Sequence, residues 1–349
     1  MDKIAAAGPN ERMDLFIETA EKRPEMSVSI VEKDFWVCWA MKHIFSGTYL
    51  PGKLVFKGGT SLSKAFHLIH RFSEDIDLSF DRKDLGFNRE RDPETAGSGK
   101  KQRALLKALQ DECNAVIRGV FVPGLVKAFV NVLGKTSEVK SVWKISIDQH
   151  DPQTVIFQYP VSSPAGRTIV PSYVRPAIRL ELGARSDSWP SDDRLIKPYS
   201  AEEFPEYFRD SGVMVNTLEA ERTFWEKATI LHAEFHRQEP DQKSERVSRH
   251  YYDLFRMIDS EPGRRAVEDL GLLARVVEHK QIFFRSAWAN YGSAKPGTLR
   301  LAPSPSRASL IKRDYVRMQE MIFETAPSWK DILDGLSGLE ERINQTGKK

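Results

Sequence analysis

The chain has 349 residues and a formal net charge of +3, because 52 Lys and Arg residues nearly balance 49 Asp and Glu residues. A chain of this length can bury a sizeable core, as one large domain or as two to three lobes. The charge balance gives no sign of a globally basic nucleic-acid binder, although local basic faces remain possible.

Cysteine usage and hydropathy indicate the cellular compartment in which the protein is expected. The two cysteines, Cys38 and Cys113, do not form a CxxC pattern, so neither a disulfide framework nor a zinc site is predicted. No apolar stretch reaches about 18 residues, and the N-terminus lacks the apolar core of a signal peptide. We therefore expect a cytoplasmic protein without a membrane partner.

Two helices are predicted within the first 48 residues. Asn10 is the candidate cap of the first helix, and Ser27 or Ser29 is the candidate cap of the second. The second helix contains residues 32–36 (EKDFW), whose charged members are expected to form a solvated face above an aromatic stripe. This helical segment is expected to pack on a core that follows it.

A β-turn-α unit follows. Residues 54–56 (LVF) predict a short buried strand, and the two glycines at 58–59 allow a tight turn that can approach a ligand closely. Thr60 or Ser61 is then placed to cap a helix that runs to about His70. The first N–H groups of such a helix are free to hold an anion.

An acidic strand closes this unit. Residues 74–80 (EDIDLSF) alternate in polarity, so the apolar residues face a core while Asp75 and Asp77 project side by side from the other face. Two carboxylates this close repel each other unless a cation lies between them, and hard oxygen ligands suit Mg²⁺ or Mn²⁺. For the Asp-x-Asp pattern alone, a solvated strand edge is the alternative. The glycine turn upstream favours a combined phosphate and metal site.

The next segment contains a misleading motif. Residues 81–100 predict a surface loop that includes GSGK at 97–100. A phosphate loop would need Gly and Ser or Thr where Glu94 and Lys101 stand, so this assignment fails. An amphipathic helix over 102–121 is predicted to follow, with apolar character continuing beyond it.

Three strands are predicted in the middle of the chain. Residues 143–148 and 154–159 predict a hairpin, and residues 177–182 (AIRLEL) predict a third strand. Glu181 shares one face of that strand with Arg179, which could neutralise it as an ion-pair partner.

The C-terminal part reads as helical and holds two further candidates. In the predicted helix 218–232, Lys227 is surrounded by aromatic and aliphatic residues. It would thus be a partly desolvated point charge, which suits a triphosphate or pyrophosphate leaving group, although a surface lysine has the same pattern. In the helix predicted at 248–255 (SRHYYDLF), Asp253 stands four residues after Arg249 and fits either a local salt bridge or a site.

These motifs together resemble the AbiEii/AbiGii-type nucleotidyltransferase toxins, which belong to the polymerase-β-like nucleotidyltransferase superfamily. Residues 57–62 (KGGTSL) and 71–78 (RFSEDIDL) are similar to the first two motifs of that family. Lys227, in the sequence WEK, resembles the lysine of the third motif, and Asp253, in RHYYDL, resembles the aspartate of the fourth. The resemblance extends from about residue 30 to residue 320.

The resemblance implies an α+β fold with a polymerase-β-like core, in which a small mixed sheet has flanking helices, and a helical C-terminal lobe. The expected regions are N-terminal helices at 1–48, the nucleotidyltransferase core at 49–200, and a helical lobe at 201–349 that completes the active site. Further helices are expected in that lobe at 276–288 and 310–323.

The resemblance also assigns roles to individual residues. The implied nucleotide-binding residues are Lys57, Gly58, Gly59, Thr60, Ser61, Lys64 and Arg71. The implied catalytic residues are Asp75, Asp77, Lys227 and Asp253. Asp75 and Asp77 would bind the metal, and Glu181 is the best-placed third ligand, since related folds often take a carboxylate from a later strand.

The implied reaction moves a nucleoside monophosphate from a nucleoside triphosphate to a hydroxyl acceptor. The acceptor would be RNA, such as the 3′ ends of transfer RNA, and the enzyme would be the toxin of a toxin–antitoxin or phage-defence system, acting by abortive infection and paired with a cognate antitoxin. Two alternatives stay open: a kinase-like toxin that phosphorylates a protein hydroxyl, and a non-catalytic nucleotide-binding regulatory module.

Overall fold

The computed structural model describes residues 1–135, 143–162, 176–237 and 246–347. The chain divides into two compact units. The first consists of Met1–Ala65 and Phe72–Thr217, and the second of Phe66–Arg71 and Leu218–Lys349. A six-residue segment of the N-terminal half therefore belongs to the C-terminal unit.

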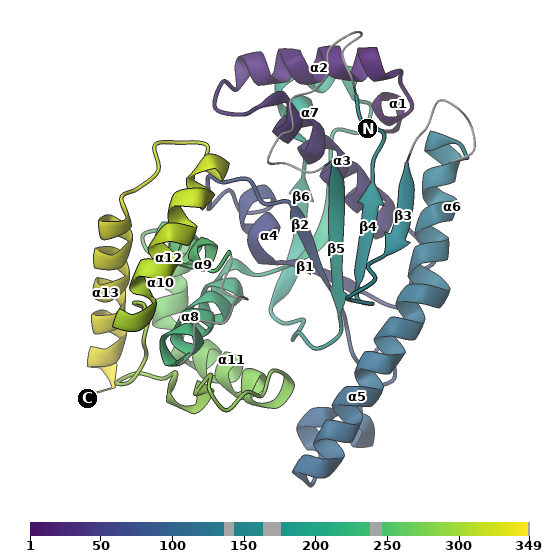
Figure 1. Cartoon of the computed structure of the whole chain (residues 1–349). Coiled ribbons are helices and arrows are strands. Elements are labelled where there is room, and N and C mark those ends of the chain that lie inside the picture. The colour runs from purple at the N-terminus through teal and green to yellow at the C-terminus, as the bar shows by residue number, and fades with distance from the viewer. Residues whose placement is uncertain (136–142, 163–175, 238–245, 348–349) are drawn as a thin grey trace. The chain divides into compact units, whose positions relative to one another are not determined.

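The first unit is built on a mixed seven-stranded sheet with the order β3-β4-β5-β2-β1-β7-β6 (Figure 1). The strands are β1 Leu54–Lys57, β2 Asp75–Phe80, β3 Lys144–Ile147, β4 Thr154–Gln158, β5 Ala177–Gly183, β6 Ser191–Ile196 and β7 Val213–Leu218. Strand β2 pairs antiparallel with β1 and parallel with β5, so the acidic strand lies in the middle of the sheet. Together with the helices of both units, this sheet confirms the predicted α+β class.

Two strands of this sheet were not predicted from the sequence. Strand β6 (SDDRLI) is the last of its sheet and mostly polar, so it lacks the apolar alternation that signals a half-buried strand. Strand β7 (VMVNTL) directly precedes a helix, and Phe56 pairs in parallel with Thr217. Parallel pairing joins segments distant in sequence and leaves no local turn signal.

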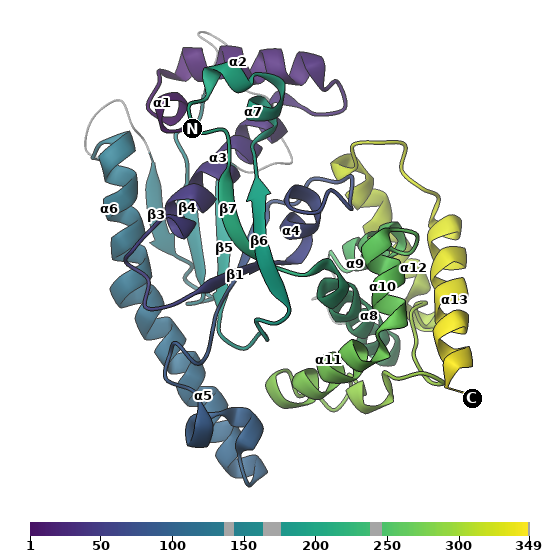
Figure 2. The same ribbon diagram turned by 180° about the vertical axis from the view of Figure 1, so that it is seen from behind.

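Helices cover this sheet. They are α1 Asp2–Ala5, α2 Pro9–Lys22, α3 Val28–Phe45, α4 Gly58–Lys64, α5 Gly99–Val116, α6 Val122–Leu133 and α7 Tyr199–Glu203, with single 3₁₀ turns at Arg89–Arg91, Pro93–Thr95 and Pro205–Tyr207. Helix α3 contacts β5 and α6, and α6 lies beside β3 (Figures 1 and 2). Ser27 caps α3, as predicted, by accepting a hydrogen bond from the Ile30 N–H at 3.4 Å. The predicted cap Asn10 is wrong, because α2 begins at Pro9 after Gly8, and proline is favoured in the first turn.

An aromatic cluster holds α3 against the sheet. Trp36 and Trp39 of α3 and Phe157 of β4 are fully buried, and the Phe157 ring centroid lies 6.1 Å and 6.0 Å from those of the two indoles. Such aromatic pairs add about 0.5–1.5 kcal/mol each beyond the area they bury. The charged residues of the same helix are therefore held in a rigid frame.

Helices α5 and α6 are joined through a π-helical stretch, Ile117–Phe121, into one continuous helix. Every fourth residue from Ile117 to Leu133 is buried, while residues such as Val120 are exposed. Among the described residues, Gly99–Leu133 is one helix whose length and hydropathy would allow it to cross a membrane. A single helix of this kind is weak evidence of a membrane span, because core helices of soluble proteins pass the same test.

The second unit is helical. Its helices are α8 Ala220–His236, α9 Ser248–Met257, α10 Glu261–Glu268, α11 Leu270–Phe283, α12 Pro305–Met318 and α13 Trp329–Thr346, with 3₁₀ turns at Tyr291–Ser293 and Gln319–Met321. Helix α8 contacts α9, α10 and α11, and α9 also contacts α12 and α13. The predicted helical C-terminal region is confirmed, although α11 ends at Phe283 and not at Trp288.

Candidate active site

The acidic strand β2 presents its carboxylates beside a neighbouring strand. In the register between β2 and β5, Asp75 is paired with Arg179 and Asp77 with Glu181. Paired residues of adjacent strands project from the same face, so Glu181 lies next to Asp77, as the sequence suggested. Arg179 Nε also lies 3.8 Å from Glu181 Oε1, and its Nη1 lies 3.1 Å from Asp148 Oδ2. Glu181 therefore has a cationic neighbour as well as an acidic one.

Hard oxygen donors are thus present, but the described residues contain no group of three or more His, Cys, Asp or Glu side chains spaced to hold a metal ion. Two carboxylates completed by water and substrate phosphates form a usual Mg²⁺ environment. The pair on β2 fits that donor chemistry.

Gly58 lies directly against this carboxylate pair. Its φ is +82°, and a Cβ built on it would lie 2.0 Å from Asp77 Oδ2. An L-residue would be strained by the backbone conformation and would collide with the carboxylate. Glycine is therefore required here for two independent reasons. The turn that the sequence predicted lies directly beside the acidic residues.

Helix α4 begins at the turn itself. The prediction that Thr60 or Ser61 caps the helix is wrong, because the cap position is Lys57 and no side chain caps it. Thr60 Oγ1 donates to the carbonyl of Asp75, and Ser61 Oγ donates to the carbonyl of Gly58 at 2.9 Å. The Thr60 hydroxyl thus fastens the turn to the acidic strand, and the Ser61 hydroxyl closes the turn on itself. Helix α4 also ends at Lys64, so the predicted extension to His70 is wrong.

The two lysines of this segment differ. Lys64 is buried, with its Nζ 2.8 Å from Asp34 Oδ1 and 3.6 Å from the centroid of the Tyr199 ring. Burial alone would lower the pKa of Lys64, but the charge of Asp34 outweighs it and raises the pKa above its ordinary value. Lys57 is half-buried and paired with Asp77 across β1 and β2. Its side chain makes no hydrogen bond or ion pair with the residues that the structure describes.

Helix α3 contributes three consecutive charged residues that are buried. The expectation of a solvated face at Glu32, Lys33 and Asp34 is wrong, since their exposed fractions are 4%, 1% and 3%. Lys33 forms a 2.7 Å ion pair with Glu74, the residue before Asp75. Asp34 also accepts a 2.7 Å hydrogen bond from the Tyr199 N–H. Sequence reasoning missed these roles, although three charges inside a strongly apolar helix were a usable signal.

The second unit holds a separate buried ion cluster centred on Asp253 of α9. Arg71 binds it in a bidentate manner, with Nε 2.7 Å from Oδ1 and Nη2 2.8 Å from Oδ2, and Lys227 Nζ of α8 lies 2.7 Å from Oδ2. The exposed fractions of Asp253, Arg71 and Lys227 are 0%, 2% and 4%. Two of the predicted catalytic residues and one predicted nucleotide ligand are therefore in direct contact.

Electrostatics fix the charge of Asp253. Burial alone would raise the pKa of Asp253, but the charges of Arg71 and Lys227 outweigh it and hold this pKa well below its usual range. Burial lowers the pKa of Lys227, and the attraction of Asp253 opposes that shift. Both oxygens of Asp253 accept charge-assisted hydrogen bonds, so it is an ionised anchor with little capacity to accept a further proton.

The segment 66–71 is also tied to this unit by its backbone. The Phe323 N–H donates to the His70 carbonyl at 2.8 Å, and Arg71 forms an isolated β-bridge with Ile322. His250 lies close to the cluster, and burial followed by the charge of Lys227 lowers its pKa well below the usual value, so it is neutral. Sequence reasoning did not assign His250 a place, although it stands three residues before Asp253.

Comparisons with known proteins were made on the whole chain. A family model described as "Nucleotidyl transferase AbiEii toxin, Type IV TA system" matches residues 39–335. The search of curated proteins gave no match. Among solved structures, the chain is similar to MenT4, a nucleotidyltransferase toxin from Mycobacterium tuberculosis H37Rv, with 13% identity and a TM-score of 0.40 over 94% of this chain and 98% of that one. The matched family model thus spans most of the sequence.

Proposed function

Because this chain belongs to the AbiEii family of nucleotidyltransferase toxins from type IV toxin–antitoxin systems, we propose that it transfers a nucleoside monophosphate from a nucleoside triphosphate to a hydroxyl of RNA. The family implies the nucleotide substrate and an antitoxin partner. The proposal adds the acceptor, for which the 3′ end of transfer RNA is the candidate, and a role in phage defence within the cytoplasm.

The observation that carries the proposal is the contact between the glycine turn and the acidic strand. Gly58 lies against Asp77 so closely that no side chain fits between them. A phosphate held by backbone N–H groups of this turn would therefore be close to the carboxylates. The first N–H groups of a helix have no partner within the helix, and we assign this contact to residues 58–61.

We assign the metal to Asp75 and Asp77, with Glu181 as the candidate for a third ligand beside Asp77. A bound Mg²⁺ would neutralise charge that develops on the phosphoryl oxygens during transfer. The protein's own contribution is to hold both carboxylates on a central strand, where hydrogen bonding on either side fixes their spacing.

Lys57 is the lysine of the turn that remains available for substrate. It is paired with Asp77 across the strands, so its ammonium group can approach the same phosphates. Lys64 and Arg71, also predicted to bind nucleotide, are both buried in ion pairs. We propose that Lys64 fixes α4 against α3, and that Arg71 fixes Asp253.

Lys227 is proposed to stabilise the pyrophosphate leaving group, and Asp253 to orient Lys227. A carboxylate in this position could instead accept the proton of the attacking hydroxyl. Its occupied oxygens and low pKa favour the orienting role. We further propose that Lys227 and the acidic pair serve one reaction. The sequence supports this, since Arg71, the partner of Asp253, stands only four residues before Asp75.

The test uses the purified chain with total RNA, Mg²⁺ and each nucleoside triphosphate labelled at the α-phosphate. The comparison protein is the double variant Asp75→Asn, Asp77→Asn. Asp193→Asn is the matched control, because Asp193 is an exposed carboxylate on β6 of the same unit. We expect label in RNA with the wild type and the control but not with the double variant.

Sequencing the labelled RNA then identifies the acceptor, and a 3′ addition on transfer RNA would support the full proposal. If RNA stays unlabelled while triphosphate still binds, nucleotidyl transfer to RNA is wrong. Repeating the reaction with γ-labelled triphosphate and cell protein would then detect the kinase-like alternative, because only that reaction moves the γ-phosphate to a protein hydroxyl.

A further inference from the structure

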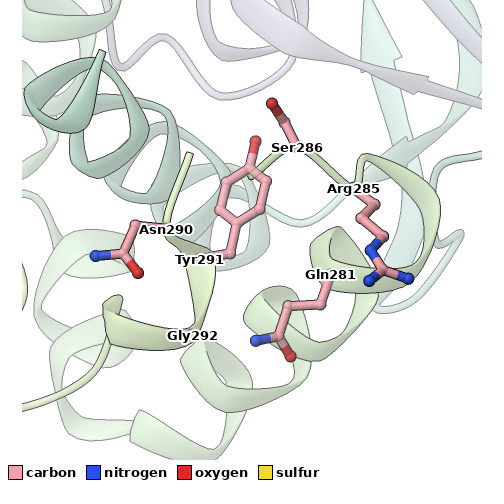
Figure 3. Close-up of a pocket in the computed structure, with 6 residues that line it drawn as sticks. All are labelled: Gln281, Arg285, Ser286, Asn290, Tyr291 and Gly292. Atoms are coloured by element: carbon pink, nitrogen blue, oxygen red, sulfur yellow. The ribbon is translucent and has the colours of Figure 1, made fainter. Parts of the chain in front are cut away.

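The second unit contains a polar cavity that the proposed chemistry does not use. It has a volume of about 340 Å³ and is lined by Gln281, Arg285, Ser286, Asn290, Tyr291 and Gly292 (Figure 3). This volume lies at the lower end of the range for small-molecule sites, about 300–1,000 Å³. The lining includes an aromatic ring, a guanidinium, two carboxamides and a hydroxyl, and no carboxylate among the residues that the structure describes.

Three binding groups of this cavity are available, whereas the Asn290 carboxamide lies 3.4 Å from His236 Nε2. The side chains of Gln281, Arg285 and Tyr291 form no hydrogen bond or ion pair with other residues in the described part of the chain. Arg285 and Gln281 lie on one side of the Tyr291 ring, and Asn290 lies on the other (Figure 3). A planar ligand that stacked on the ring would thus have the hydrogen-bonding groups of Gln281 and Arg285 along one edge.

The wall that carries Tyr291 is fixed in place. Asn290 has a left-handed backbone conformation (φ +46°), and its carbonyl lies 3.2 Å from Nε2 of the fully buried His232. Nδ1 of the same imidazole accepts the Arg300 N–H at 3.1 Å. The ammonium group of Lys280 lies 5.6 Å from the Tyr291 ring centroid and donates to the Glu226 carbonyl at 2.9 Å. The cavity is therefore preformed, which lowers the entropic cost of binding.

We propose that this cavity binds one nucleotide of a single-stranded RNA. In this arrangement the base stacks on Tyr291, the carboxamide of Gln281 meets its edge, and Arg285 binds an adjacent phosphate. Stacking on aromatic rings combined with arginine contacts to the backbone is the usual way in which single strands are held.

The charge of the cavity favours a strand over a free triphosphate. Among the described residues of the lining, Arg285 is the one charged side chain, so it matches the single charge of a phosphodiester. A triphosphate would bring several negative charges and a metal ion, and the described part of the lining supplies no carboxylate to hold that metal.

Neighbouring residues extend the surface beyond one nucleotide. Phe284 and Trp288 are 42% and 39% exposed and follow one another closely in the chain, so two apolar rings are open to solvent beside the cavity residues. The Arg237 guanidinium lies 3.8 Å from the centroid of the Trp288 ring and so holds that indole in place. Over residues 275–300, five Lys and Arg residues stand against a single acidic residue, Glu278, although Lys280 is buried and Arg300 is paired with Glu340. Exposed rings among positive charges suit consecutive bases of a strand.

This inference rests on the proposed function in one respect, since the strand would be the RNA acceptor. Binding is nevertheless separable from transfer. The test therefore uses the full-length double variant Asp75→Asn, Asp77→Asn, without triphosphate or Mg²⁺, and a short fluorescein-labelled single-stranded RNA followed by anisotropy.

Arg285→Ala and Tyr291→Ala are introduced into that background. The control is Arg313→Ala, which removes an exposed arginine of α12 that forms no hydrogen bond or ion pair with the other described residues. We expect each cavity variant to weaken RNA binding about tenfold, whereas the control leaves binding unchanged. Arg285→Ala should also reduce the slope of log K against log salt concentration by about 0.7, the value for one phosphate contact on a single strand.

RNA binding that Arg285→Ala and Tyr291→Ala leave unchanged would overturn the inference, and so would the absence of RNA binding. Equal affinity for a single-stranded DNA of the same sequence would overturn the assignment to RNA. Failure of the proposed function looks different, because label transfer by the wild type would then be absent while cavity-dependent RNA binding remained.

Discussion

The Cα of Gly58 and the carboxylate of Asp77 are so close that a Cβ on residue 58 would lie 2.0 Å from Asp77 Oδ2. The contact joins the turn after β1 to the acidic strand β2, and Thr60 reinforces it by donating a hydrogen bond to the carbonyl of Asp75. The phosphate-binding turn and the metal-binding strand of the proposed site are thus one packed unit.

The first prediction concerns Gly58→Ala. The new methyl group must displace Asp77, and the positive φ adds about 1–2 kcal/mol of strain. A misplacement of about 1 Å in a catalytic group costs about 100-fold in rate, so we expect at least that loss of nucleotidyl transfer. The control is Gly97→Ala, because nothing lies within 4 Å of a Cβ at that position. Activity of Gly58→Ala equal to that of this control would contradict the proposed site.

The second prediction separates the roles of Lys227 and Asp253. Lys227→Met leaves Asp253 paired with Arg71 through two hydrogen bonds, so the fold should be retained while transfer falls about 100- to 1,000-fold. Asp253→Asn removes the common counter-charge of two buried cations and should lower the free energy of unfolding by about 3–5 kcal/mol. Urea unfolding and initial rates measure the two effects. If Lys227→Met destabilised the protein as much as Asp253→Asn, the lysine would be structural.

The third prediction concerns the buried pair of Asp34 and Lys64. Asp34→Ala leaves the Lys64 ammonium buried without its 2.8 Å partner and should cost about 3–5 kcal/mol of unfolding free energy. Replacing both residues by apolar ones, as in Asp34→Leu with Lys64→Met, should recover most of this loss. The control is Lys107→Met, which breaks an exposed ion pair with Asp111 and should cost about 0.5 kcal/mol or less. A double variant as unstable as Asp34→Ala would show that the contact between α3 and α4 depends on the ion pair.

The fourth prediction concerns pH. Burial lowers the pKa of His232 to about 4, compared with 6.5 in an unfolded chain. Below pH 6.5 the unfolded state therefore binds a proton that the folded state cannot bind until about pH 4. Stability is complete above pH 6.5 and falls as the pH decreases through this window, with a limiting slope of about 1.4 kcal/mol per pH unit for one proton.

In urea unfolding between pH 4 and pH 7, His232→Gln should reduce the slope of the unfolding free energy against pH by the amount that corresponds to about one proton. A residual slope should remain, because burial also lowers the pKa of His250. His150→Gln changes an exposed loop histidine and serves as the control. An unchanged slope in His232→Gln would show that the folded protein binds a proton at His232 as easily as the unfolded chain does.

The sequence alone determined the features that depend on local pattern. The alternation in 75–80 predicted the acidic strand, the glycines at 58–59 predicted a turn, and helical spacing predicted α8 and α9 around Lys227 and Asp253. Motif order was enough to indicate the family, because the motifs are short segments with distinctive chemistry. Periodicity reports how each element meets a core, and that information lies within a few neighbouring residues.

Only the tertiary structure decided which partner each charged residue takes. Lys64 meets Asp34, Lys33 meets Glu74, and Arg71 meets Asp253, over separations of 30 to 182 residues in the sequence. A buried charge is stable only when an opposite charge or hydrogen bonds compensate for its lost hydration, and the chain supplies them from distant elements. The local sequence pattern does not indicate which distant residue supplies this compensation. For this reason the predicted solvated face of α3 became buried ion pairs, and two residues expected to bind nucleotide were found in ion pairs.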